Sequence, residues 1–450
     1  MSPDWGIETE VGQMVRRWMV AVLVMALAPV GLSLTSTAGS SGGTGRYIVV
    51  LNESANADAV ADRATGLGAT VNGLFSSLNT LVVSLSPQRV ASLRRDPRVA
   101  FVTADKPVRL LSGTTASTGS VDGVPTGVMR IGAAPLAGVA NADKKAAVAV
   151  VDTGIMPRPD LNVVGGFDCA NDLLGDLLGG SGGKTKDNNG HGTHVAGTVG
   201  AIDTGQGVVG VSPGTPLYAI RVFSSFGAGS MSNVICGLDW VAANAAANNI
   251  KVVNMSLGGE GTDDGKCGTT DNDAFHAAVC RLTAAGVTVV VAAGNSKADL
   301  AKSVPANYDE VLAVTAMADF DGKAGGLFSG TASCTSKDKD DVAADFSNFA
   351  VPGAPDADHV IAAPGVCITS TWNNGKFKSI SGTSMASPHV AGLVARCIDA
   401  GPCAGMTPAQ IIAKLKADAA ARSADTGFLG DTHRPIDGQF YGNLVDDKGY

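Results

Sequence analysis

Near-continuous runs of apolar residues recur along the chain after residue 145, and longer helical stretches separate them. Apolar strands without polar alternation, joined through helices, are typical of a parallel sheet that is covered on both faces. The sequence therefore predicts an α/β fold, a three-layer doubly wound parallel sheet. The expected strands are Ala146–Val151, Pro216–Val222, Lys251–Met255, Val287–Ala292, Val311–Thr315 and Val360–Ala363, with long helices at Val234–Asn248 and Ala274–Ala285.

A smaller pattern of strands and helices precedes this sheet. Its order is β-α-β-β-α-β, which indicates a small ferredoxin-like α+β unit. The expected elements are Arg46–Asn52, Asp58–Gly66, Ala69–Phe75, Thr80–Leu85, Pro87–Arg95 (with Ser86 as N-cap) and Arg98–Thr103. About sixty residues make a core of marginal stability. Residues 106–122 are small and polar in their latter half and predict an exposed linker.

The N-terminal segment has the pattern of an export signal. Arg16 and Arg17 precede an apolar run that ends near Leu34, and small residues at 36–38 have the spacing of a signal-peptidase site. Pro29 and Gly31 interrupt the run, which favours a cleaved signal over a membrane anchor. We therefore expect residues 1–38 to be a signal peptide, with Met14 as an alternative start, and a secreted product without a stable membrane anchor.

Composition narrows the classes of function. Hydrophobic residues make up 45% of the 450 residues and charged residues 16%, as in a folded protein. The net charge of −8 argues against a nucleic-acid partner. All eight cysteines lie between Cys169 and Cys403, without a C-x-x-C or H-E-x-x-H motif. The favoured bridges are Cys397–Cys403 and Cys267–Cys280, and the alternative is a mixture of bridges and buried free thiols.

Three segments supply the parts of a nucleophilic serine site. Ser384 lies in GTSMASPH (382–389), Asp152 in VAVVDTG (148–154) and His191 in NGHGTHVAGT (189–198). A serine hydroxyl becomes a useful nucleophile when an imidazole takes its proton and a carboxylate orients that imidazole. The order Asp…His…Ser differs from those of chymotrypsin-type enzymes and of α/β-hydrolases. A fourth segment, VVVAAGNS (289–296), carries Asn295 after a predicted strand.

On these four motifs the chain resembles the subtilisin-like serine peptidases. The resemblance implies a triad in which Asp152 orients His191, His191 is the general base and Ser384 is the nucleophile, with Asn295 in the oxyanion hole. His194 and His389 are interpreted as structural. Catalysis would need no cofactor and no metal. A catalytically silent binding module of the same fold is one alternative, and an esterase or acyl transferase is another.

The resemblance also implies a domain organisation and partners. Residues 46–105 would be an inhibitor prodomain, with an independent binding domain as the alternative, and 106–122 would be a linker with the processing site. Residues 123–447 would be the peptidase domain, with Tyr441–Asp446 as its last strand. Ser256, Leu257 and Gly258, with the looser match at Phe226–Gly229, would flank an extended protein or peptide substrate, with a preference for apolar or aromatic side chains at the cleaved position. We expect a monomer. Extra surface loops are expected at Leu173–Gly183, Gly261–Thr270 and Ser329–Asp345. Their aspartates could bind a structural calcium ion.

Overall fold

The structure is a computed structural model that describes residues 43–111, 123–133, 146–170, 185–330, 332–447 and 450. The predicted signal peptide and the Leu173–Gly183 loop lie outside the described residues, as do residues 112–122 of the predicted linker. Residues 43–450 belong to one structural unit. Within the described ranges, no helix is long and apolar enough to cross a bilayer.

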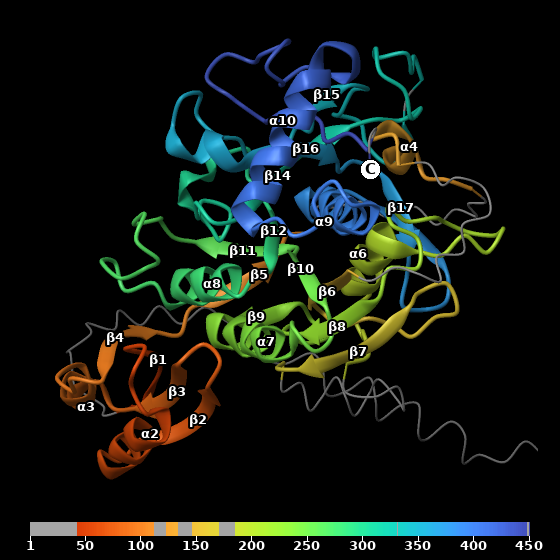
Figure 1. The fold of residues 1–450 in the computed structure, drawn as a ribbon. Coiled ribbons are helices and arrows are strands. Elements are labelled where there is room, and N and C mark those ends of the chain that lie inside the picture. The colour runs from red at the N-terminus through yellow and green to blue at the C-terminus, as the bar shows by residue number, and fades with distance from the viewer. Residues whose placement is uncertain (1–42, 112–122, 134–145, 171–184, 331, 448–449) are drawn as a thin grey trace, which may run out of the picture. The chain divides into compact units, whose positions relative to one another are not determined.

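A parallel sheet runs through the centre of the molecule (Figure 1). Its strand order is β7-β8-β6-β10-β12-β14-β16, every neighbouring pair is parallel, and the short β15 pairs antiparallel with β14. The strands are β6 (Ala147–Asp152), β7 (Val163–Asp168), β8 (Leu217–Arg221), β10 (Ile250–Met255), β12 (Thr288–Ala292), β14 (Leu312–Ala318), β15 (Val342–Ala343) and β16 (Val360–Pro364). All six predicted strands are present, and β7 was missed.

The direction of winding reverses between β6 and β10. After β6 the chain adds β7 and β8 on one side, and from β10 onward it adds strands on the other side. In open α/β sheets, ligands bind beyond the carboxyl ends of the strands at such a switch point. Asp152 is the last residue of β6, and Ser256 directly follows β10. The topology therefore brings two of the predicted site residues to the position where a binding cleft is expected.

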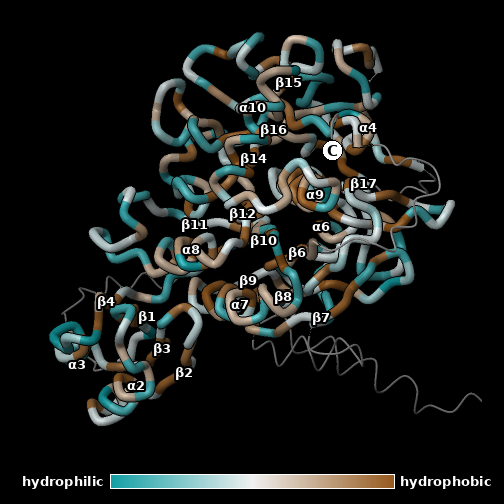
Figure 2. Tube along the Cα trace, viewed as in Figure 1, coloured by the Kyte–Doolittle hydropathy of each residue, from teal (hydrophilic) through white to brown (hydrophobic). Residues whose placement is uncertain are grey.

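Helices cover both faces of the sheet (Figure 1). One face carries α6 (His191–Gly200), α9 (Thr383–Ala400) and α10 (Pro408–Thr426), and the other carries α7 (Met231–Asn244) and α8 (Ala274–Ala284). Val148 and Val150 of β6 belong to the first core, whereas Ala149 and Val151 belong to the second. Because both faces are buried, the central strands consist mostly of hydrophobic residues, and Lys251 and Asn254 are the polar residues of β10 (Figure 2 shows the hydropathy along the chain). The predicted doubly wound sheet is confirmed.

The predicted β-α-β-β-α-β order at the N-terminal end is also confirmed. Its sheet has the order β2-β3-β1-β4, and α2 and α3 pack on one face. Ser86 stands at the N-cap of α3, but its side chain makes no capping hydrogen bond. The elements are β1 (Gly45–Leu51), α2 (Ala57–Gly66), β2 (Thr70–Phe75), β3 (Thr80–Leu85), α3 (Pro87–Arg94) and β4 (Val99–Ala104).

The second face of this N-terminal sheet packs against α7 and α8. Ile48, Val82 and Phe101 share a hydrophobic core with residues of both helices. Two hydrogen bonds at Leu78 add to this packing. The backbone N–H of Leu78 donates to Asp239 of α7 at 2.9 Å, and Arg281 of α8 donates to the carbonyl oxygen of Leu78. The N-terminal sheet is therefore joined to the back of the larger domain by both apolar and polar contacts.

Residues 106–111 do not form the exposed linker that the sequence predicted. Residues 107–110 form β5 (Pro107–Leu110), which lies antiparallel between β9 (Ala228–Ser230) and β11 (Leu257–Glu260). The side chain of Val108 is only 1% exposed. The prediction was wrong here because the small, polar residues that suggested a linker begin only after Leu111, whereas V-R-L-L can pair as a strand.

The remaining elements are short or lie near the C-terminal end. They are α4 (Thr126–Arg130), β13 (Ser303–Val304), the hairpin of β17 (Ile368–Thr371) and β18 (Phe377–Ile380), and 3-10 turns at Leu300–Lys302 and Pro355–His359. The long helix α10 and this hairpin were not predicted. The predicted last strand at Tyr441–Asp446 is wrong, since only an isolated bridge between Leu444 and Ala362 forms there.

Four disulfides account for all eight cysteines. The pairs are Cys169–Cys236, Cys267–Cys280, Cys334–Cys367 and Cys397–Cys403. Both bridges that the sequence favoured are present, and the alternative with free thiols is wrong. The two remaining bridges span 67 and 33 residues, so only the tertiary structure could identify their partners.

Candidate active site

Asp152 and His191 form a buried pair at the carboxyl end of β6. The Nδ1 atom of His191 lies 2.8 Å from Oδ1 and 2.9 Å from Oδ2 of Asp152. Both side chains are almost fully buried. A carboxylate on Nδ1 keeps the proton there and leaves Nε2 as the basic atom. Nε2 has no hydrogen-bond partner among the residues that the structure describes.

A second buried carboxylate, Asp187, holds the start of α6, the helix that His191 begins. Asp187 accepts hydrogen bonds from the backbone N–H groups of Asn189, Gly190 and Thr193 and from the hydroxyls of Thr153 and Thr193, all at 2.6–2.9 Å. Burial raises the pKa of Asp187, and these hydrogen bonds oppose that shift. Every hydrogen-bond partner of Asp187 is a donor, which matches the acceptor-only oxygens of a carboxylate. The sequence reasoning missed this residue, because it predicted no helix at His191 and so gave no reason to look for an aspartate near a helix start.

Gly192 allows α6 to approach β6 closely. A Cβ atom at this position would lie 2.1 Å from the carbonyl oxygen of Gly154 and 3.2 Å from the side chain of Asp152. A larger residue would therefore push the helix away from the strand. The glycine after His191 is a geometric requirement of the Asp152–His191 contact.

Ser384 is the second residue of α9, where the free N–H groups of a helix favour a developing negative charge. Its hydroxyl donates to the carbonyl oxygen of Ser256 at 3.1 Å, so the structure does not join it to Nε2 of His191. The hydroxyl of Ser256 in turn donates to the carbonyl oxygen of Ser384 at 2.9 Å. This reciprocal pair fixes the first turn of α9 against the end of β10.

Asn295 follows β12 on a turn beside the start of α9. Its Oδ1 atom accepts hydrogen bonds from the backbone N–H of Thr383 at 2.9 Å and from the Thr383 hydroxyl at 2.8 Å. These contacts fix the orientation of the amide and turn its NH₂ group outward. The NH₂ group donates to the backbone carbonyl oxygen of Leu111. Asn295 thus holds a carbonyl oxygen of another chain segment beside Ser384.

A buried side chain, Asn348, holds the turn that carries Asn295. Its Oδ1 atom accepts from the backbone N–H groups of Ser296 at 2.9 Å and Ala298 at 3.1 Å, and its Nδ2 atom donates to the carbonyl oxygen of Ala293 at 3.0 Å. Gly294 has a φ of +112°, and a Cβ atom there would lie 2.2 Å from Asn348 Nδ2. The sequence reasoning did not identify Asn348, because its partners are about 50 residues away in the chain.

The segment that ends in Leu111 lies along the cleft as an extended strand. Leu110 pairs with Leu257 and Arg109 with Gly258 on one side, while Val108 pairs with Gly229 on the other. The N–H of Leu111 donates to the carbonyl oxygen of Ser256 at 3.4 Å. A peptide bound through both of its edges is a β-augmentation mode of recognition. The sequence analysis expected Ser256–Gly258 and Phe226–Gly229 to flank a substrate. The strands β11 and β9, which overlap these two segments, are the ones that pair with β5.

A cavity of about 510 Å³ opens beside the side chain of Leu111. Its inner wall contains Gly258, Ala292, Val304 and Ala306, all buried, and the exposed Glu260 and Lys302 lie at its edge. The small residues on the wall leave room for an apolar side chain larger than leucine. The pocket therefore lies beside the residue whose carbonyl oxygen accepts from Asn295.

The other two histidines of these motifs are fully buried and lie outside the proton path. Burial lowers the pKa of His194 to about 3 and that of His389 to about 4. His194 Nε2 lies 3.0 Å from the carbonyl oxygens of Ile368 and Lys378, and Nδ1 of His389 donates to the carbonyl oxygen of Met385. The His194 ring thereby links α6 to the hairpin of β17 and β18, whereas the His389 ring bonds back to its own helix α9.

A buried Asp–His pair, a serine at a helix N-terminus and an amide that donates to a peptide carbonyl oxygen thus lie at the carboxyl edge of a doubly wound sheet. The model of the subtilase family of peptidases matches residues 143–435. M-protease of Shouchella clausii (strain KSM-K16) is 36% identical over 324 residues, which cover 71% of this chain and 69% of that protein. Subtilisin J of Geobacillus stearothermophilus is 32% identical over 404 residues, which cover 88% of this chain and 91% of that protein.

A solved structure is also similar. A cold adapted subtilisin-like serine proteinase shares 29% sequence identity and aligns with a TM-score of 0.49, covering 72% of this chain and 97% of that chain. The family match covers more than half of the chain, and the curated relatives extend across both halves. The chain belongs to the subtilase family and is a serine-type endopeptidase.

Proposed function

We propose that the chain hydrolyses peptide bonds through a triad of Asp152, His191 and Ser384, with an acyl-enzyme intermediate. Asn295 and the backbone N–H of Ser384 would stabilise the oxyanion of the tetrahedral intermediate. The observation that carries the proposal is the hydrogen bond from Asn295 to the carbonyl oxygen of Leu111, at the end of a segment bound along the cleft. Subtilases need no cofactor for this chemistry.

The first step requires one rotation. Ser384 Oγ turns from the carbonyl oxygen of Ser256 toward Nε2 of His191, which has no other hydrogen-bond partner among the described side chains. His191 takes the hydroxyl proton as Oγ attacks the carbonyl carbon, and Asp152 stabilises the imidazolium. The imidazolium then gives its proton to the leaving amine, and water hydrolyses the ester in the same way.

The chain itself supplies a first substrate. Residues 46–105 act as an inhibitor prodomain, and residues 106–111 occupy the cleft in the manner of the acyl side of a cleaved peptide. The register of β5, with Leu111 at Asn295, supports a cut between residues 111 and 112. The tether raises the effective concentration of this bond, which favours an intramolecular first cut.

Substrates are extended protein or peptide segments with an apolar residue at the position of Leu111. The buried side chain of Val108 and the cavity beside Leu111 support two apolar subsites, with the exposed Arg109 and the partly buried Leu110 between them. The product is secreted as a monomer. Four disulfides and a signal-like N-terminal segment support an oxidising compartment.

A fluorophosphonate probe tests the nucleophile. The purified protein should be labelled at Ser384, and the Ser384→Ala chain should keep its fold, lose labelling and lose turnover by about 10⁶-fold. Ser333→Ala, an exposed serine in a loop, is the control. Labelling that survives in Ser384→Ala would contradict the triad, and an unlabelled but folded parent would favour a silent binding module. Comparing amide with ester turnover separates the endopeptidase from an esterase.

A further inference from the structure

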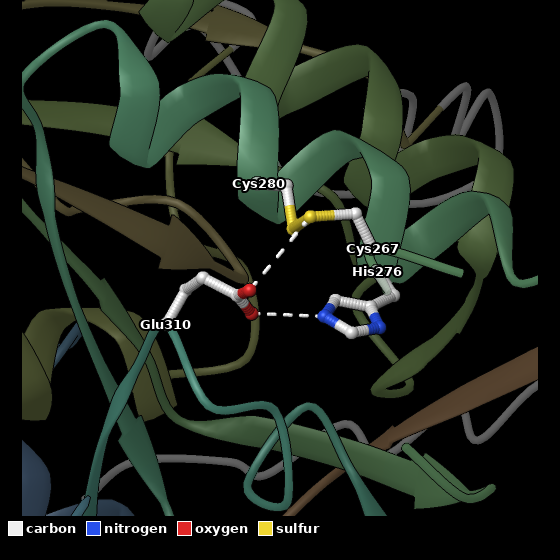
Figure 3. Close-up of side chains that lie close together, drawn as sticks. All are labelled: Cys267, His276, Cys280 and Glu310. Carbon is white, nitrogen blue, oxygen red and sulfur yellow. Dashed lines mark hydrogen bonds and ion pairs between the residues drawn. A yellow bond between two sulfur atoms is a disulfide. The ribbon is translucent and has the colours of Figure 1, made fainter. Parts of the chain in front are cut away.

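His276 is a fully buried histidine outside the active site, surrounded by carboxylates. It lies in the first turn of α8, and its side chain is 0% exposed. Its Nε2 atom lies 2.8 Å from Oε2 of Glu310, as Figure 3 shows. A carboxylate on Nε2 holds the proton on that nitrogen and leaves Nδ1 as a ligand atom. The Nδ1 atom of His276 is therefore available to bind a cation.

Two more carboxylates face Nδ1. Nδ1 lies 3.1 Å from Oδ1 of Asp263 and 3.6 Å from Oδ1 of Asp264, yet it makes no hydrogen bond to any described residue. An imidazolium paired with a carboxylate normally makes a direct bond of about 2.7–2.9 Å. In a tetrahedral zinc site with bonds of about 2.0–2.2 Å, two ligand atoms lie about 3.3–3.6 Å apart. The observed separations match two ligands of one ion better than a hydrogen-bonded pair.

Both carboxylates are held in place by their own loop. Asp264 accepts four hydrogen bonds at 2.7–2.9 Å, from the backbone of Lys266, Gly268 and Thr270 and from the Thr270 hydroxyl. Asp263 accepts from the N–H of Gly265 at 2.8 Å, and its side chain is 14% exposed. Metal-binding carboxylates are usually fixed by such hydrogen bonds. The partial exposure of Asp263 gives an ion a way in.

The imidazole ring cannot turn away from this cluster. It stacks on Tyr308 with the ring centres 4.1 Å apart and the planes 4° apart. The Tyr308 hydroxyl donates to Asp273 at 2.6 Å, and Asp273 also caps α8. The stacked ring therefore keeps Nδ1 directed toward Asp263 and Asp264.

The nearby cysteines are not part of the ligand set. Cys267 and Cys280 lie within reach of His276 and Glu310, but Figure 3 shows their sulfur atoms joined in a disulfide. A disulfide sulfur lacks the thiolate charge that zinc ligands need. The remaining cluster of Asp263, Asp264 and His276 has its ligand atoms within 4.8 Å of one another. The disulfide fixes the loop that carries both aspartates.

We propose that Asp263, Asp264 and Nδ1 of His276 form a binding site for a divalent transition-metal ion of the zinc class, with Glu310 orienting the imidazole. An imidazole nitrogen among two carboxylates suits zinc better than calcium, which prefers oxygen ligands alone. The ion ties the loop after the cleft strand β11 to the start of α8. It stabilises that loop and takes no part in peptide hydrolysis.

Direct binding tests the proposal without reference to activity. The full chain carrying Ser384→Ala, which prevents self-digestion, is freed of metal with a chelator and titrated with zinc chloride by calorimetry. Binding of one equivalent is expected to weaken at least about 100-fold in Asp263→Asn and about 10–100-fold in Glu310→Gln. Asp271→Asn removes an exposed carboxylate of the same loop and is the matched control. His191 is unchanged in every variant, so any zinc that binds at the active site contributes equally to each titration.

Equal zinc binding by the parent and Asp263→Asn would overturn the proposal, as would an equal loss in Asp271→Asn. If Asp263→Asn does not fold, zinc binding by Glu310→Gln is compared with that of the parent, because Glu310 is half-buried and outside the ligand set. Equal binding would then overturn the proposal. Zinc X-ray absorption should show nitrogen and oxygen neighbours at about 2.0–2.2 Å without sulfur. A sulfur shell at about 2.3 Å, or displacement of zinc by equimolar calcium, would contradict the ligand set.

Discussion

The side-chain amide of Asn295 donates a hydrogen bond to the backbone carbonyl oxygen of Leu111, a residue 184 positions earlier in the chain. Three separate segments make this contact: β12 leads to Asn295, Thr383 at the start of α9 orients its amide, and β5 delivers Leu111. A hydrogen-bond donor at a carbonyl oxygen polarises that carbonyl toward nucleophilic attack. The contact joins the proposed catalytic site to the proposed first substrate.

Asn295→Ala should lower kcat by about 10²–10³-fold and change KM little, because its hydrogen bond strengthens as negative charge develops on the oxygen. The range is the one measured for the corresponding donor in a subtilisin, carried over by family membership. Steady-state kinetics on a peptide p-nitroanilide gives both constants. A rise in KM with unchanged kcat would make Asn295 a substrate-binding residue instead.

Asn348→Ala should reduce both stability and turnover, although Asn348 does not contact the cleft carbonyl. The change leaves the N–H groups of Ser296 and Ala298 without their acceptor, which costs about 2–4 kcal/mol. The loosened turn should lower kcat about tenfold through Asn295. Lys297→Ala, which changes an exposed side chain of the same turn, is the control. Lower stability with an unchanged kcat would limit Asn348 to a structural role.

Maturation should give a new N-terminus at Ser112. Mass spectrometry of wild-type protein tests this, and the Ser384→Ala chain should keep residues 46–111 attached. Leu111→Asp should slow the cut at least about 100-fold, since a carboxylate would replace an apolar side chain that lies against Gly258 on the buried wall of the cavity. Ala100→Asp places the same new side chain at an exposed position of β4 that does not line this cavity, and this variant should process normally.

Two results would contradict this account of maturation. One is trimming of the Ser384→Ala chain at the same bond in a protease-free expression system, which would make another protease responsible. The other is full activity of the mature enzyme in an excess of the separated prodomain, which would rule out inhibition by residues 46–105.

The buried His389 should make stability fall in acid. Its pKa is lowered to about 4 by burial, from a usual value of 6.5. Between those values the unfolded chain binds a proton that the folded chain does not, so the contribution is present above pH 6.5 and is lost as pH falls toward 4. The loss is about 3 kcal/mol in total.

Denaturant unfolding of the Ser384→Ala chain at pH 7.5 and at pH 4 measures this loss. A His389→Gln substitution in that background should remove about 3 kcal/mol of the pH dependence, and the exposed His433→Gln is the control. An unchanged pH dependence in His389→Gln would mean that His389 is not buried in neutral form.

The sequence by itself determined the sheet and the identity of the chemical groups. Continuous apolar strands can be stable only when both faces are covered, so β6, β10, β12 and β14 were predictable from local pattern. The order of Asp152, His191 and Ser384 pointed to the family because each lies in a short motif. Two disulfides of short span were predictable for the same reason.

Only the tertiary structure decided which distant segments meet. The pairing of β5 with β9 and β11, the support of Asn295 by Asn348, and the cluster of Asp263 and Asp264 around His276 all join residues that are separated in sequence or lie in irregular loops. Local propensity carries no information on such contacts, because they depend on how the sheet twists and where its helices pack. The residues of 107–110 become a strand because two cleft edges offer them unpaired backbone groups.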